Sequence, residues 1–128
     1  MRCFDVTFLI DYVRGGASAV EKVRELLEAS ERMTTPAIAA AEVLVGAHYR
    51  GGREPSQTLE LLERLDVIPF GIGEVTEAGR LGAESIRRGA PLVGNDLLAA
   101  ATARHHRGIL VSRDAVFSGV PGLAVEVY

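Results

Sequence analysis

Short apolar runs alternate with helix-like segments along the chain, and this alternation restricts the fold more than any other feature. Residues 2–4 (RCF), 67–70 (VIPF) and 109–112 (ILVS) read as buried strands, and residues 31–34 supply another. The last expected strand, 124–127, alternates apolar and polar residues, which is typical of a sheet edge. Central strands that are apolar throughout indicate a parallel sheet with helices on both faces. The sequence therefore predicts an α/β fold.

The helices between these strands have recognisable start signals. Ser18 and Glu21 have the spacing of a capping box. Thr35 is expected to be an N-cap that precedes a proline, Pro36, at the first helical position. Asn95 is expected to cap the last helix. The predicted helices cover residues 7–15, a segment beginning at 18, and residues 37–50, 55–66, 74–88 and 96–107.

Length and composition fit one domain over residues 1–128, with 48% apolar residues to supply a core. The single cysteine, Cys3, excludes an intramolecular disulfide and is expected to be a core residue, which suits a reducing compartment. Asp5 and Asp11 interrupt the apolar start of the chain, which a secretory segment would avoid. No run reaches the ~18 apolar residues of a membrane span. We therefore expect a cytoplasmic protein without membrane association.

Four acidic residues stand where chemistry is expected in such a fold. Asp5 directly follows the first strand, Asp114 follows strand 109–112, and Asp96 lies in the first turn of its helix. Ligands bind at the carboxyl ends of parallel strands. Glu42 is the only charge between Met33 and His48, and a carboxylate on such an apolar helix is costly unless a charge meets it.

Each acid taken alone has a structural explanation. Asp5 could cap the first helix, Asp96 could favour its helix dipole, and Asp114 could begin a turn. Taken together, four converging carboxylates would repel by about 4 kcal/mol per close pair at an effective dielectric of ~20. Divalent cations would remove this repulsion, and oxygen ligands without His or Cys favour Mg²⁺ or Mn²⁺. The paired histidines, His105 and His106, lack a third ligand at useful spacing, which argues against zinc.

The segments that carry these acids resemble a known family. FDVTFLIDYVRG, AAAEVLVGA, GNDLLAAATA and LVSRDAVF are similar, in order and spacing, to the successive motifs of PIN-domain ribonucleases. The resemblance is strongest to the VapC toxins of prokaryotic toxin–antitoxin pairs, and it runs from residue 4 to about 118. One departure is that Ala115 and Val116 stand where many relatives carry a further acid or asparagine, so that binding of a second metal stays open.

The resemblance implies a PIN-like α/β/α fold with about five parallel strands in the order 3-2-1-4-5. It further implies a magnesium-dependent endoribonuclease that acts on RNA, forms a homodimer and is inhibited by a VapB-type antitoxin. The acids Asp5, Glu42, Asp96 and Asp114 match the catalytic metal site, and Thr7, Ser112 and Asn95 match polar residues that support it. The helices over 36–50 and 55–66 are expected to form either an antitoxin cleft or the homodimer contact.

Other functions fit the sequence less well. An aspartyl phosphatase would need an acid where Thr7 stands, and a response-regulator receiver needs a late lysine, whereas the only lysine is Lys22. A structure-specific 5′-nuclease would need an insertion that this chain has no room for. A catalytically silent PIN-like binding module remains the non-enzyme alternative.

The net charge of −3 is unusual for a protein that binds RNA. Two features offset it: four of the acids are expected to face metal ions, and every basic residue except Lys22 is arginine, which binds phosphate well. The candidate contacts to the RNA backbone are Arg14, Arg50, Arg87, Arg88 and the run 104–107.

Overall fold

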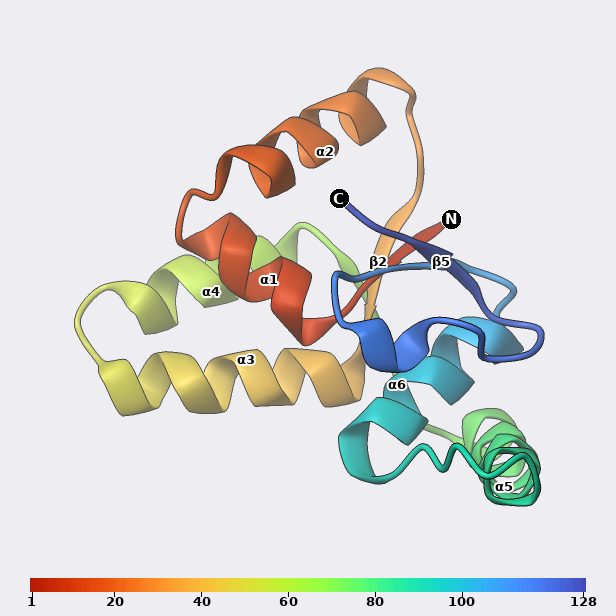
Figure 1. Ribbon diagram of the computed structural model, residues 1–128. Helices are drawn as coiled ribbons and strands as arrows, with labels where there is room; N and C mark the ends of the chain where they lie inside the picture. The colour runs from red at the N-terminus through yellow and green to blue at the C-terminus, as the bar shows by residue number, and fades with distance from the viewer.

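A central sheet of five parallel strands organises the computed structural model, which describes residues 1–128 (Figure 1). The strand order is β3-β2-β1-β4-β5, so the predicted order 3-2-1-4-5 and the edge position of the last strand are confirmed. All four strand pairings are parallel. The strands are β1 (Arg2–Phe4), β2 (Met33–Pro36), β3 (Asp66–Ile68), β4 (Ile109–Val111) and β5 (Ala124–Glu126).

Six α-helices and one short 3₁₀ helix connect the strands. They cover both faces of the sheet, which gives the three-layer arrangement expected for apolar parallel strands. No helix is both long and apolar enough to cross a lipid bilayer. The helices are α1 (Val6–Val13), α2 (Ala17–Glu28), α3 (Ala37–Arg50), α4 (Glu54–Glu63), α5 (Ile72–Arg87), α6 (Gly94–His105) and η1 (Ala115–Phe117).

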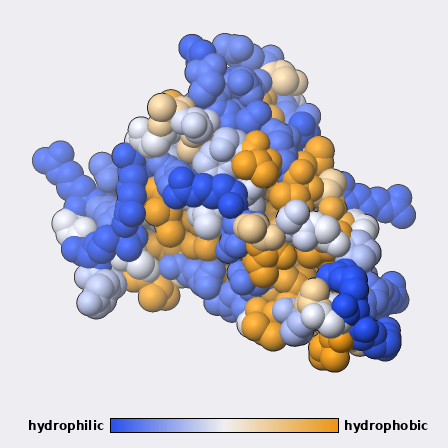
Figure 2. Space-filling view, in the orientation of Figure 1, coloured by the Kyte–Doolittle hydropathy of each residue, from blue (hydrophilic) through white to orange (hydrophobic).

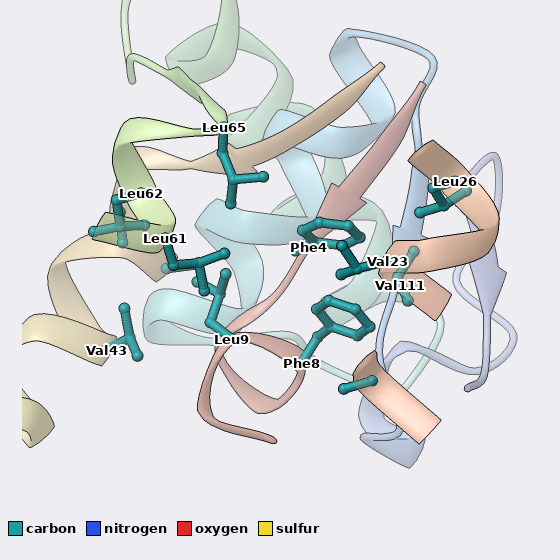
Figure 3. Close-up of a cluster of buried hydrophobic side chains, with 13 residues drawn as sticks. Phe4, Phe8, Leu9, Val23, Leu26, Val43, Leu61, Leu62, Leu65 and Val111 are labelled. Atoms are coloured by element: carbon teal, nitrogen blue, oxygen red, sulfur yellow. The ribbon is translucent and has the colours of Figure 1, made fainter. Parts of the chain in front are cut away.

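Two hydrophobic clusters hold the layers together, one on each face of the sheet. Successive side chains of a strand point to opposite faces, so Phe4 joins the cluster under α1 to α4, while Cys3 joins the cluster under α5 and α6. In the first cluster the ring of Phe4 stacks on that of Phe8, with centroids 4.1 Å apart (Figure 3). This stacking fixes the start of α1 against β1.

Cys3 is a core residue, as predicted. Its side chain has no exposed surface, and burial raises the pKa of its thiol to about 11. A thiol with such a pKa stays protonated at neutral pH and is a poor nucleophile.

Several predicted helix starts are wrong. Thr35 and Pro36 end β2, and the Thr35 hydroxyl donates to the backbone oxygen of Phe4 instead of capping α3. Ser18 lies inside α2, whose N-cap is Gly16. Asn95 lies in the first turn of α6, after its N-cap Val93. Cap rules identify suitable residue types, but here the Thr35 hydroxyl bonds to the neighbouring strand and the Asn95 amide bonds to Glu42.

The core predicts that replacing a leucine by alanine costs far more stability in α1 than at an exposed position of the neighbouring helix α2. Leu9 is fully buried, and Leu9→Ala is expected to lower the free energy of unfolding by about 2–5 kcal/mol because it leaves a cavity. Leu27 is 61% exposed, and Leu27→Ala is expected to stay within about 0.5 kcal/mol of the wild type. Urea unfolding followed by circular dichroism measures both; equal losses would contradict this description of the core.

Candidate active site

Four segments meet at the carboxyl edge of the sheet. The parallel register sets Phe4 of β1 beside Val111 of β4, so the residues that follow both strands emerge together. The first two turns of α3 and the first turn of α6 lie next to them, near the centre of Figure 1. These segments carry Asp5, Glu42, Asp96 and Asp114.

Asp5 is the buried centre of this edge, with only 3% of its surface exposed. Its Oδ1 accepts hydrogen bonds from the Thr7 hydroxyl, at 2.7 Å, and from the Phe8 backbone N–H, at 3.0 Å. Its Oδ2 accepts one from the Ser112 hydroxyl. Burial raises the pKa of Asp5, and these hydrogen bonds oppose that rise. Asp5 therefore is the N-cap of α1 and also presents a fixed carboxylate at the sheet edge.

Ser112 connects Asp5 to Asp114. While its hydroxyl donates to Asp5, the hydroxyl oxygen accepts a hydrogen bond from the Asp114 backbone N–H at 3.0 Å. The Asp114 carboxylate in turn accepts from the Val116 N–H at 3.0 Å and caps η1. A single buried hydroxyl thus sets the position of one acid relative to another.

Asp96 is the acid whose pKa the charges of the other three raise. Partial burial raises its pKa first, and then the negative charges of Asp114, Glu42 and Asp5 raise it further. All four acids are therefore close enough to interact electrostatically. No Lys or Arg forms an ion pair with any of them; Arg113, beside Asp114 in sequence, turns to Asp11 instead, at 3.0 Å.

Glu42 lies at the rim of this cluster. Its Oε1 accepts a hydrogen bond from the Asn95 side-chain amide at 2.7 Å, which joins α3 to α6. Both residues also line a pocket of about 610 Å³ along α3, with Val6, Ile38, Ala41, Val45 and Gly46. Apolar surface is uncovered beside α3 and around the start of α6 (Figure 2).

The donor set fits a hard divalent cation. It consists of carboxylate oxygens, its like charges have no cationic partner, and Mg²⁺ prefers such ligands while keeping several waters.

Of the basic residues proposed to contact RNA, Arg104 already forms ion pairs within the protein. Its side chain is 11% exposed and its guanidinium donates to Glu77 and Glu84, which leaves little of it for an RNA phosphate. Arg50 pairs with Glu54 at 2.7 Å. Among the arginines predicted to contact RNA, those that are exposed and form no ion pair are Arg14, Arg87, Arg88 and Arg107.

Sequence reasoning missed one group of candidate ligands. Glu74 supplies the third ligand that His105 and His106 were expected to lack. No spacing rule could have found it, because Glu74 precedes His105 by 31 residues and meets it only through the packing of α5 on α6.

Comparison with known proteins agrees with this fold. The family model for the PIN domain matches residues 2–123. VapBC2 from Rickettsia felis, crystallised with a promoter DNA fragment, has a chain with TM-score 0.85 and 22% identity, covering 99% of this chain and 98% of that one. A chain of a toxin–antitoxin complex from Klebsiella pneumoniae has TM-score 0.76 and 27% identity, covering 97% and 96%. No curated protein sequence matches the chain.

The cluster predicts that Asp96 weakens the metal-free fold. In EDTA at pH 7, Asp96→Asn is expected to raise the thermal unfolding midpoint by a few degrees, because it removes a charge that three other acids repel. Since the pKa of Asp96 is raised, the folded protein takes up that proton before the unfolded chain does. The gain in stability of the variant is therefore full above the pKa that Asp96 has in the folded protein. It disappears as the pH falls towards 3.8, the ordinary pKa of an aspartate.

Thermal unfolding of wild type and variant between pH 7 and pH 4 tests this expectation. Glu28→Gln is the control, since Glu28 is exposed and forms no ion pair. A variant at position 96 that is less stable than the wild type at pH 7 would show that the acids do not repel one another.

Proposed function

The chain belongs to the PIN domain family, and we propose that it is a magnesium- or manganese-dependent endoribonuclease of the VapC toxin type. The observation that carries this proposal is the group of four carboxylates around Asp96 with no cationic side chain among them. A protein would hold such repulsive charges together at little benefit unless a cation bound there. The family match and the likeness to chains of toxin–antitoxin complexes support the same function.

Each acid has a distinct part in the proposed reaction. Asp5, Asp96 and Asp114 would hold the ion, which supplies Lewis-acid activation of water and neutralises charge on the scissile phosphate. Thr7 and Ser112 keep the Asp5 carboxylate in one orientation through their hydroxyl hydrogen bonds. This fixed orientation lowers the reorganisation needed when substrate arrives.

Glu42 is suited to a different part, as ligand or as the base that orients the attacking water. It lies at the rim of the cluster and faces the pocket along α3. The Asn95 amide holds one carboxylate oxygen, which leaves the other free to accept a proton from water. In-line attack by that water on an RNA phosphodiester would leave a 5′-phosphate on the product.

Cleavage by the purified protein tests the function directly. Asp5→Asn and Asp96→Asn are each expected to reduce magnesium-dependent cleavage of an RNA panel by at least about 100-fold, because each removes a charge that holds the ion. Sequencing the new RNA ends identifies the cut site. Circular dichroism shows whether the variants keep the fold, and Asp66→Asn, an exposed acid on β3, is the matched control.

Cleavage that both variants retain would defeat the assignment of the site. A folded wild-type protein that cuts no RNA with Mg²⁺ or Mn²⁺ would favour the catalytically silent binding module.

The pocket along α3 is proposed to receive a VapB-type antitoxin. Its walls are largely apolar, and Glu42 forms part of them, so an occupant would cover the acid cluster as it binds. Val45, on the same helix face, is 70% exposed, which leaves apolar surface for a partner. The alternative occupant is a second copy of the chain.

Val45→Glu is expected to weaken binding of the proposed VapB-type antitoxin by at least tenfold, because it places a charge in an apolar contact. Calorimetry measures the affinity, and light scattering reports whether the variant also loses a dimer. Ile86→Glu is the control, since Ile86 is equally exposed on α5, on the opposite layer. Unchanged affinity together with loss of the dimer would assign this face to the homodimer.

A further inference from the structure

Three metal-ligating side chains meet at the end of α6 that is remote from the acid cluster. Glu74 lies in the first turn of α5, His105 is the last residue of α6, and His106 is its C-cap. One ligand atom from each lies within 4.8 Å of the other two. Glu74 Oε1 is 2.6 Å from His106 Nε2.

The fold fixes the Glu74 carboxylate, while both histidine rings are exposed. Glu74 is 8% exposed, and its second oxygen accepts a hydrogen bond from the Gly71 N–H at 3.0 Å, which fixes the carboxylate. Gly73 leaves space for the His105 ring, since a Cβ there would lie 2.6 Å from His105 Nε2. α5 is seen end-on beside α6 in Figure 1, and these helices make the most extensive helix–helix contact in the molecule.

Two imidazoles with one carboxylate form a ligand set for zinc, whereas magnesium prefers oxygen atoms alone. Tetrahedral zinc with bonds of about 2.0–2.2 Å needs ligand atoms roughly 3.3–3.5 Å apart, so the three groups must shift by about an ångström. Both histidines are exposed, so their side chains can rotate to close this gap and an ion can reach them. Three protein ligands leave the fourth position to water.

We propose that Glu74, His105 and His106 form a second metal site, selective for Zn²⁺ over Mg²⁺, that fastens α5 to α6. Nine residues separate Asp96 from His105 along α6, which corresponds to about 14 Å. An ion at this site is thus too far from the acid cluster to share its ligands, and its effect is on stability. The two ends of one helix would bind ions of different chemistry.

Calorimetric titration of the metal-stripped full-length protein with ZnCl₂ at pH 7.5 tests the proposal. Excess MgCl₂ is present throughout to occupy the acid cluster. The wild type is expected to bind one Zn²⁺ per chain and to unfold at a higher temperature when it is bound. His105→Ala, His106→Ala and Glu74→Gln are each expected to weaken Zn²⁺ binding at least tenfold.

Two variants make the result specific. His48→Ala removes the only other histidine and is expected to bind Zn²⁺ like the wild type. Asp96→Asn damages the acid cluster and is also expected to bind Zn²⁺ normally, which separates this site from the proposed nuclease centre. Because His105 and His106 are exposed, their alanine variants are expected to fold, as circular dichroism can show.

The proposal is overturned if the wild type binds no Zn²⁺ in the presence of Mg²⁺. It is equally overturned if His48→Ala or Asp96→Asn loses as much Zn²⁺ affinity as His105→Ala, since the ion would then be bound elsewhere.

Discussion

Uncompensated negative charge at one edge of the sheet is the constraint on which this structure depends. Parallel strands bring the residues after β1 and β4 to the same place, and helices from two other segments add a carboxylate each. Nine other acidic side chains have an Arg, Lys or N-terminal amine partner within 4.0 Å, but these four have none. This cost in stability supports the proposed cation site.

Asp5 shows how one residue serves both the fold and the site. As N-cap it satisfies the Phe8 N–H, which stabilises the start of α1. The Thr7 and Ser112 hydroxyls meet the same carboxylate, so the side chain has little freedom to turn. A structural explanation and a functional one therefore do not compete at this position, because the hydrogen bonds that cap the helix also orient the acid.

Helix α6 joins the two charged regions of the molecule. Its centre, from Ala99 to Ala103, is buried, so the helix is held firmly against the sheet. Its first turn presents Asp96 to the acids, and its last residues present two histidines to Glu74. A rigid, buried helix with a polar group at each end keeps the two regions at a fixed separation.

The sequence by itself determined the α/β class, the positions of most elements and the four acids that gather at the sheet edge. It could do so because strand and helix periodicity is local, and because carboxyl ends of parallel strands share an edge. The strand order came from the resemblance to a family rather than from periodicity.

Only the tertiary structure decided which polar groups meet across the chain. It placed Thr35 in a strand, joined Asn95 to Glu42 over 53 residues, and brought Glu74 to His106 over 32. It also paired Arg104 with Glu77 and Glu84 through salt bridges. The physical reason is that such contacts depend on how whole helices pack, and residue types along one segment do not specify the distance to another.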